Sequence, residues 1–421
     1  MTIFGPPSLK GSLLSVGTLS LLLVSNLYAA DYIINKNIEK ALQFGNSEGK
    51  YGKVKFDLNY RYENDDSINP SKKVGNASTV RLRIGYLSPE FHGFQGYAEY
   101  EGMQDIGVNT YNSTRNGKSE FETILDPQEH ELNQLWLSYN GLADTVIKVG
   151  RQRIKLDNDR FIGNVGWRQM EQTFDAVLIT NKSLPNTTIK VGYIAQAQNI
   201  RSMVEPMQTP FLNVSYKIKD IGALTAYGYW MDINGSTPAP YNLHASNQTY
   251  GISFNGGTKI NETLKALYRA EYAYQKDYGD NPTQYEADYY HVMGGLSAFN
   301  VTAKVGFEQL DGKGALKTFD TPLATGHAFN GWSDQFLGTP ADGLRDVYAS
   351  LGTKIKGVKL VGIYHEYTDD TGSTDYGNEW NFLVTKKFAK HYSLLAKYAY
   401  FQGDNGRFDA QNIWVGAGVS F

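Results

Sequence analysis

The sequence predicts an all-β protein, a single antiparallel transmembrane β-barrel of about 18 strands with short periplasmic turns and long extracellular loops. Three observations lead to this prediction. Apolar and polar residues alternate along many short segments, which is the pattern of strands with one apolar and one polar face. Short and long connections follow each other in turn between these segments. The last segment keeps its alternation up to the final residue, Phe421.

Composition excludes several other classes of protein. The chain has 421 residues, more than one ordinary compact core holds, but a large barrel is an exception to that limit. Cysteine is absent, which excludes a disulfide framework, a thiolate nucleophile and a cysteine–zinc site. Lys and Arg number 40 and Asp and Glu number 43, so the chain lacks the strongly basic face of a nucleic-acid-binding protein. The 30 Tyr and 43 Gly favour strands with tight turns and interfacial aromatic residues.

The N-terminus has the features of an export signal. Lys10 precedes an apolar run over residues 13–27, and Ala29 and Ala30 offer a cleavage site before Asp31. An N-terminal membrane anchor is the alternative, but the run is short for a spanning helix of about 20 residues. We therefore expect a signal peptide at residues 1–30, a short periplasmic segment at 31–50 and the barrel at 51–421.

The first predicted strand shows the alternation that the others repeat. From Val54 to Tyr62, apolar residues are separated by Lys55, Asp57, Asn59 and Arg61. One such strand is equally compatible with a soluble β-sandwich, but the repetition favours a barrel. The further predicted strands cover residues 79–87, 94–102, 135–139, 145–149, 174–180, 189–195, 212–218, 223–231, 250–256, 264–274, 285–294, 301–307, 347–355, 358–367, 380–384, 392–400 and 412–421.

The lengths of the connections are a second, independent signal. Short ones lie at residues 88–91, 140–144, 219–222, 256–261, 356–357 and 387–391, and long ones at 65–76, 103–129, 203–210, 234–247, 311–343, 369–378 and 403–410. A barrel with its termini in the periplasm has short turns on that side and long loops outside. A soluble sandwich has no reason to sort its connections in this way.

The final strand indicates closure and a lipid-facing outer surface. A closed sheet has no free edge, so the last strand must pair with the first. Its terminal aromatic residue, Phe421, resembles the sorting signal of outer-membrane barrels. Aromatic residues toward strand ends are typical of an interfacial girdle; they are Tyr60, Tyr86, Tyr100, Tyr193, Tyr272, Trp380 and Tyr400.

If the apolar face meets lipid, the polar face lines a lumen. Arg81 and Arg83 are two residues apart, so both are expected to point inward at a spacing of roughly 7 Å. Glu99 and Glu101 are related in the same way. Each such charge is either a solvated lumen group or half of an ion pair that braces the wall. The same parity applies to Arg61, Lys190, Lys265, Arg269, Lys304, Glu308 and Lys397.

Residues 150–177 interrupt the alternation with a dense group of charges: Arg151, Arg153, Lys155, Asp157, Asp159, Arg160, Arg168 and Glu171. Continued alternation from Ile147 and Val149 would send Arg151 and Arg153 toward lipid, where an arginine costs about 2–4 kcal/mol at the mid-plane. A β-bulge at Gly150 would reverse the parity. The sequence therefore predicts that bulge, with both arginines facing the lumen.

The same stretch, GRQRIKLDNDRFIGNVGWRQMEQTFDAV, resembles the signature of the alginate export porin family of Gram-negative outer membranes. The resemblance implies a monomeric barrel of about 18 strands with a constricted, electropositive lumen, and a dedicated member that exports the polyanion alginate. It also implies lumen or constriction roles for Arg151, Arg153, Asp157, Arg160 and Arg168. The dedicated exporter resembles a longer chain whose long periplasmic loop occludes the pore, and no short-side connection here has that length.

Other chemistries find little support. The seven His residues show neither helical pair spacing nor a Glu partner, so a catalytic zinc is not expected. No nucleophile elbow or phosphate-binding glycine loop is present. Residues 368–372, Thr-Asp-Asp-Thr-Gly, are either a calcium-binding loop or a solvated outer loop. No cofactor and no enzymatic activity are expected.

We therefore expect an outer-membrane channel that passes anionic solutes, with its pore lined by Arg151, Arg153, Lys155, Asp157, Asp159, Arg160, Arg168, Arg81, Arg83, Glu99, Glu101 and Arg269. The expected partners are an anionic polysaccharide or a small anionic solute, outer-membrane lipid, and periplasmic export or assembly factors. One alternative is a general or selective porin that takes up small organic acids or oligosaccharides. Another is a barrel that serves as scaffold for a hydrolase or an adhesin.

Overall fold

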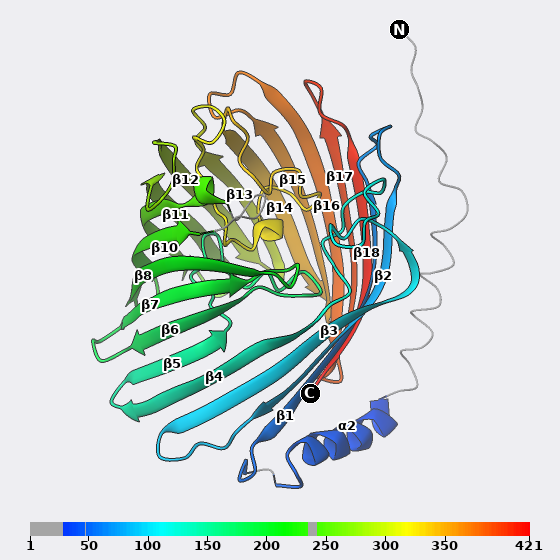
Figure 1. Ribbon diagram of the computed structural model, residues 1–421, viewed down its shortest axis with the longest axis vertical. Coiled ribbons are helices and arrows are strands. Elements are labelled where there is room, and N and C mark those ends of the chain that lie inside the picture. Colours follow the sequence, from blue (N-terminus) through cyan, green and yellow to red (C-terminus); the bar gives the residue numbers. More distant parts are fainter. Residues whose placement is uncertain (1–27, 47, 235–241) are drawn as a thin grey trace.

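The computed structural model describes residues 28–46, 48–234 and 242–421, so most of the predicted signal peptide lies outside the described residues (Figure 1). The described chain forms one 18-stranded antiparallel sheet that closes on itself, which confirms the predicted fold. Each strand pairs with its sequence neighbours, and β1 also pairs with β18. Helix α2 (Tyr28–Leu42) precedes the barrel; its first three residues fall in the expected signal peptide and the rest in the segment expected to be periplasmic.

All eighteen predicted segments are strands. Their bounds are β1 Lys53–Asp66, β2 Gly75–Leu87, β3 Phe94–Thr110, β4 His130–Leu142, β5 Thr145–Gln152, β6 Thr173–Asn181, β7 Thr187–Gln198, β8 Val204–Ile218, β9 Gly222–Ile233, β10 Asn247–Lys259, β11 Leu264–Asp277, β12 Glu286–Ala298, β13 Val301–Leu310, β14 Leu344–Ile355, β15 Val358–Thr368, β16 Asp375–Phe388, β17 Tyr392–Gly403 and β18 Ala410–Ser420. Two 3₁₀ turns, η1 (Leu243–Ala245) and η2 (Gly326–Ala328), lie in long loops.

Closure extends to the end of the chain. In the β1–β18 ladder Leu58 lies opposite Val419 and Tyr60 opposite Ala417. Beyond the ladder, the backbone N–H of Phe421 donates to the Phe56 carbonyl at 2.8 Å, and the N–H of Phe56 donates back at 3.2 Å. The terminal residue is therefore part of the seam, as an edge-free sheet requires.

Parity separates an apolar outer face from a polar inner face. Val305 is 64% exposed, and Leu137 and Val292 are also exposed, although all three lie within paired strands. Their polar neighbours in sequence point into the bore. An apolar surface of this kind on a closed barrel is the surface that lipid covers. No helix in the described ranges has the length and hydropathy of a membrane-spanning helix.

The two ends of the barrel differ in the way that the connection lengths predicted. At the short-turn end, Lys356 and Gly357 alone join β14 to β15, with φ of 47° and 82°. Two residues of positive φ match the twist of the flanking strands, which makes such tight hairpins favourable. The long loops all leave from the other end.

Two of the long loops fold back into the bore. Residues 153–172, between β5 and β6, and residues 311–343, between β13 and β14, are together called the plug below. They join as a short parallel bridge at Ile162 and Leu323. The Gly163 N–H donates to the Leu323 carbonyl, and the Thr325 N–H donates to the Asp159 carbonyl, both at 2.9 Å. The plug is therefore built from two loops that lie far apart in the sequence.

Candidate functional site

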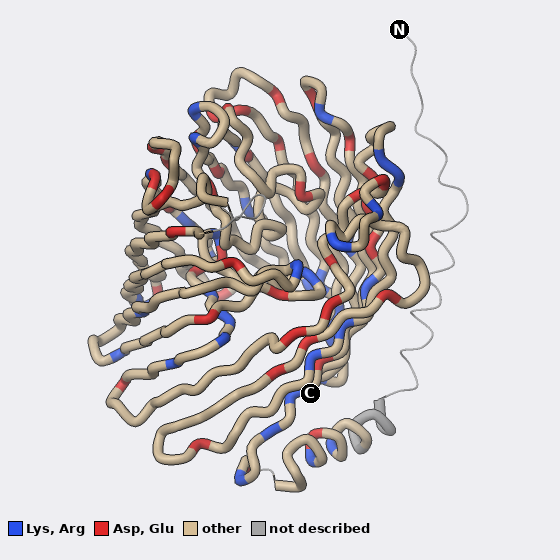
Figure 2. Tube along the Cα trace, viewed as in Figure 1, with Lys and Arg blue, Asp and Glu red and all other residues tan. Residues whose placement is uncertain are grey.

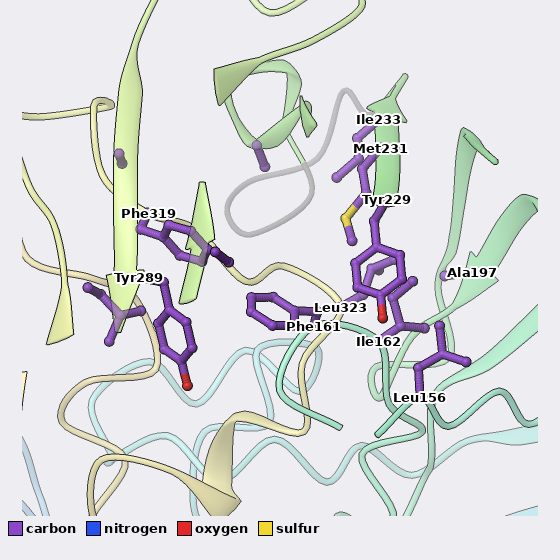
Figure 3. Close-up of a cluster of buried hydrophobic side chains, with 14 of the residues drawn as sticks. Leu156, Phe161, Ile162, Ala197, Tyr229, Met231, Ile233, Tyr289, Phe319 and Leu323 are labelled. Atoms are coloured by element: carbon purple, nitrogen blue, oxygen red, sulfur yellow. The ribbon is translucent and has the colours of Figure 1, made fainter. Parts of the chain in front are cut away.

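An apolar centre fixes the plug inside the barrel. The Phe161 ring lies 5.3 Å from the Tyr227 ring, 5.5 Å from that of Tyr289 and 5.9 Å from that of Phe319. Tyr227 belongs to β9 and Tyr289 to β12, whereas Phe319 belongs to the second plug loop. Figure 3 shows Phe161 between Phe319, Leu323 and the inward side chains of the wall. At this level side chains fill much of the bore.

A first ion cluster ties the plug to β1. The Arg168 guanidinium donates to Glu63 Oε1 at 2.9 Å and lies 3.3 Å from Asp334 Oδ2. Arg61 pairs with Asp126, which comes from a third long loop, and donates to the Trp167 carbonyl at 2.6 Å. Burial disfavours ionisation of Asp126, but Arg61 and Arg168 outweigh it and hold the pKa of that carboxyl below its ordinary value.

A second cluster ties the plug to β2 and β3. Arg153 Nε donates to Glu171 Oε1 at 2.5 Å, and its Nη2 donates to Glu99 Oε1 at 2.9 Å. Arg83 pairs with Glu101. Burial opposes the charge on Glu171, yet Arg83 and Arg153 lower the pKa of that carboxyl. In Figure 2 basic and acidic segments lie close together here, along β1–β3. Arg81 also joins this cluster, through Asp57 and Glu101.

A third cluster lies on the other side of the bore. Arg160 Nε lies 3.0 Å from Glu308 Oε1 on β13, and Arg160 Nη2 donates to Asn330 Oδ1 at 2.9 Å. Arg269 pairs with Glu271 two residues along β11, and Glu271 also accepts from Tyr227 at 2.8 Å. Thus Arg153, Arg160 and Arg168, which follow one another in a single loop, reach three different parts of the wall.

In the plug loop of residues 153–172, Asp157 and Asp159 stabilise the conformation of the loop itself. Asp157 Oδ2 accepts from Asn213 Nδ2 at 2.8 Å, and burial raises the pKa of this carboxyl. Asp159 forms an ion pair with Lys155 at 2.9 Å, and the Lys155 side chain is largely exposed. Asp157 and Asp159 have φ of 54° and 66°, the left-handed conformation that Asp tolerates better than most residues. They shape the turn that delivers Phe161.

The expected bulge at Gly150 is absent, and Arg151 does not face the lumen. The β4–β5 ladder runs without a shift from Leu137–Val149 to Leu135–Arg151, and the β5–β6 ladder is also regular there. Arg151 keeps the outward parity of Val149 and is neutralised by Asp175, with Nε–Oδ1 at 2.7 Å. Its position near the long-loop end of the barrel explains why this is tolerated.

Gly150 has another role. Its φ is 115°, and a Cβ there would lie 2.2 Å from the Leu135 carbonyl oxygen, so only glycine fits. Arg153 reaches the lumen for a different reason: β5 ends at Gln152, and the chain then turns inward as the plug. Strand termination, rather than a bulge, brings this arginine inside.

The sequence missed a cage of aromatic residues around Lys397. The ammonium lies 3.9 Å from the Trp332 ring centre, 4.3 Å from that of Trp167 and 5.3 Å from that of Trp414. Lys397 Nζ also lies 2.5 Å from His327 Nε2, and His327 Nδ1 lies 2.7 Å from Asp334. The signal in the sequence was a set of four aromatic residues within residues 311–343, namely Phe319, Phe329, Trp332 and Phe336.

The short-turn half of the bore has a different character. We call this half the vestibule. If the five residues nearest the short turn are taken from each of the eighteen strands, Asp57 is the only acidic residue among them. Near the short turns, lysines of inward parity form no ion pair within the described ranges, and six of them are called the vestibule lysines below. They are Lys55 (β1), Lys148 (β5), Lys190 (β7), Lys265 (β11), Lys304 (β13) and Lys354 (β14).

A cavity of about 400 Å³ lies between the plug and the short-turn half of the bore. Lys55, Asp57 and Arg83 line it from the wall, and Arg153 and Glu171 line it from the plug. Arg153 is the most exposed of the plug arginines that pair with the wall, with 33% of its side chain accessible. Among the described residues no group of His, Asp and Glu has the arrangement of a metal site. At residues 368–372, Asp369 accepts from the Thr371, Ser373 and Thr374 N–H groups instead.

Comparison with known proteins adds a family and a set of folds. The sequence profile described as alginate export matches residues 52–317. No curated protein sequence matches this chain significantly.

Several solved porin structures share the fold. OccAB3 of Acinetobacter baumannii is 14% identical with a TM-score of 0.67, over 87% of this chain and 98% of that one. A BenF-like porin of Pseudomonas fluorescens Pf-5 is 16% identical with a TM-score of 0.67, over 89% and 100%. OpdK of Pseudomonas aeruginosa, solved with vanillate, is 10% identical with a TM-score of 0.66, over 87% and 98%. At these identities the likeness concerns the fold.

Proposed function

Because this chain belongs to the alginate export family and is an outer-membrane channel, we propose that it selects anionic solutes through its vestibule lysines. The observation that carries the proposal is the absence of carboxylates, Asp57 apart, from the strand residues nearest the short turns. A lumen lined by one sign of charge, with low-dielectric walls, concentrates ions of the opposite sign. The plug arginines contribute less, because carboxylates of the wall and plug neutralise them.

The proposed path combines weak binding with a narrow passage. A lysine ammonium is a hydrated point charge on a flexible stem, so it attracts a carboxylate without holding it in one geometry. Successive weak sites of this kind let an ion enter and leave a channel. We place the narrowest passage at the cavity beside Arg153, where Lys55 and Arg83 also face the solute. We propose transport without catalysis, by a single chain closed through its own seam.

The proposed solute class is a carboxylate-bearing sugar, polymeric or short, as the family name suggests. A second candidate is a small organic acid or oligosaccharide taken up from outside. Two observations favour the second candidate: the plug fills much of the bore, and the cavity beside Arg153 has about the volume of a monomeric solute. The OpdK structure contains vanillate, itself a small carboxylate.

Planar-bilayer recordings in a salt gradient test the selectivity. We expect the sign of the reversal potential to show anion preference. Its magnitude should fall toward zero in the triple variant K190Q/K265Q/K304Q. The matched control is Lys386→Gln, because Lys386 is also near a short turn on β16 but has outward parity. The control should leave the reversal potential unchanged. An unshifted triple variant, or equal shifts in both, would contradict the proposal.

The solute class needs a separate measurement. Oligouronates and vanillate can each be added to one side while the block of chloride current is recorded. Block by oligouronates at lower concentration supports the polysaccharide class, and block by vanillate alone supports small acids. Neutral oligosaccharides of equal size are the control, since block by these would show that size rather than charge governs entry.

A further inference from the structure

Helix α2 is docked on the rim of the barrel by a polar face. Asn35 Oδ1 accepts from the Tyr392 hydroxyl at 2.9 Å, and Asn35 is only 6% exposed. Glu39 Oε1 lies 2.6 Å from Lys390 Nζ and 2.9 Å from His391 Nε2. Asn35 and Glu39 are four residues apart, so they lie on the same side of the helix. This side meets the short turn between β16 and β17.

A second face of α2 is apolar and remains at least partly exposed among the described residues. Ile34, Ile38 and Ala41 are spaced four and three residues apart, which places them on one side of a helix. Ile34 is 54% exposed, and Phe44, just beyond the helix, is 52% exposed. Lys36 is two residues from both Ile34 and Ile38, so it lies on the side opposite the apolar face, and both Lys36 and Lys40 are exposed.

The place of α2 identifies what covers the apolar face. Apart from Lys390 and His391 in the β16–β17 turn, the residues that α2 and its C-terminal extension contact through hydrogen bonds and rings lie on the outer face of the barrel. Tyr392 lies opposite Phe388 and shares its outward parity, and the Phe44 ring packs edge-to-face on Tyr86 of β2 at 6.1 Å. Figure 1 shows α2 beside the start of β1 and the C-terminus, at the short-turn end. The apolar face is thus continuous with the lipid-facing surface at the edge of the bilayer.

We infer that α2 is an interfacial helix whose Ile34–Ile38–Ala41 face lies among the phospholipids of the periplasmic leaflet. Such a helix lies in the membrane plane with its apolar side buried at the boundary between headgroups and acyl chains. Lys40, together with Lys50 after the helix, then meets the headgroup phosphates. The docking contacts of Asn35 and Glu39 set the depth of the helix. A helix that capped the lumen would instead contact the inward side chains of the vestibule.

The complete absence of cysteine allows a site-specific test in the whole protein. Single variants Ile34→Cys, Ala41→Cys and Lys36→Cys are labelled with the same small environment-sensitive fluorophore. Each protein is reconstituted in vesicles of phosphatidylethanolamine and phosphatidylglycerol. Barrel folding is checked first by heat-dependent gel migration. Quenching is then measured with acrylamide in water and with phospholipids brominated on the acyl chains, because acrylamide is uncharged and indifferent to nearby lysines.

Labels at Ile34 and Ala41 should be quenched by brominated lipid and shielded from acrylamide at least about fivefold compared with the Lys36 label, as expected for an interfacial helix. Glu39→Gln removes one docking contact and should leave the lipid quenching in place, because the apolar face itself remains. Equal acrylamide quenching at all three positions in a folded barrel would overturn the inference. Shielding from both quenchers would also overturn it, because it would mean that protein covers this face.

Discussion

The plug half and the vestibule half of the same bore treat charge in opposite ways. Around the plug, Arg153, Arg160 and Arg168 each meet at least one buried carboxylate. Toward the short turns, lysines of the same inward parity meet none. Parity alone therefore does not assign a role to a lumen charge. The role depends on whether the charge has a partner. Arginine occurs where an ion pair forms, which suits its rigid, forked guanidinium, and lysine occurs where none forms, which suits its mobile ammonium.

The two arrangements also differ in what a single substitution costs. A buried ion pair that loses one member leaves the other charge uncompensated, at a cost of about 3–5 kcal/mol. An exposed lysine without a partner has no comparable contact to lose. The plug half should therefore respond to mutation through structure and the vestibule half through ion selectivity.

Arg168→Met should have the largest effect. It removes the one guanidinium that contacts Glu63, Asp126 and Asp334 together and leaves Arg61 paired with the first two, so about 3–5 kcal/mol of plug stability should be lost. We expect a several-fold rise in single-channel conductance and new protease cleavage within residues 153–172. The matched control is Lys155→Met, on the same loop but with 57% of its side chain exposed. Equal behaviour of the two variants would mean that the ion cluster does not hold the plug.

Phe161→Ala should follow closely. It removes a ring that contacts Tyr227, Tyr289 and Phe319, and a cavity of this kind costs about 3–5 kcal/mol. Conductance should rise while the reversal potential stays constant, since the vestibule lysines are untouched. Phe91→Ala, in an exposed short turn, is the control. A changed reversal potential would show that the plug core contributes to selectivity.

Acidification should loosen the plug and leave the vestibule charged. Burial lowers the pKa of His327 to about 3 from an ordinary 6.5, so plug stability falls as pH drops from 6.5 toward 3. The pKa of Asp126 is held below its ordinary 3.8, so its contribution is present above 3.8 and is lost at lower pH. Conductance should rise progressively below pH 6.5.

His327→Gln separates the two groups. The variant should lose the rise in conductance between pH 6.5 and about 4. It should keep the rise at lower pH that comes from Asp126. His92→Gln, in an exposed turn, should leave the whole profile intact. A conductance that does not change from pH 7 to 3 would contradict the assignment of both groups to the plug.

The sequence was informative about the wall and much less so about the plug. Alternation has a period of two, so it states for each strand which residues face out, and all eighteen segments followed it. The alternation of short and long connections distinguished the two ends of the barrel. Neither signal says where a long loop goes. The inward return of residues 311–343 depends on contacts such as Ile162–Leu323, between residues that are far apart in the chain.

The charged stretch shows the same limit in detail. Its residues were correctly singled out, but parity was extended one step too far, past the end of β5 at Gln152. Beyond a strand the alternation no longer applies, so Arg153 is inside and Arg151 outside without any bulge. The carboxylates that neutralise the arginines come from β1, β3 and β13 and from other loops. Such pairings could not be inferred from spacing within one segment.

Arg151→Gln should have the smallest effect, and it sharpens the contrast with Arg153. Arg151 lies on the outer face and pairs with Asp175, both partly exposed, so the ion pair contributes at most about 1 kcal/mol. The reversal potential and conductance should match those of the unmodified channel. Arg153→Gln, which frees Glu99 and Glu171 beside the cavity, should weaken anion preference measurably. If both variants shifted the reversal potential equally, Arg151 would have to reach the ion path, and the regular ladder through Gly150 would be wrong.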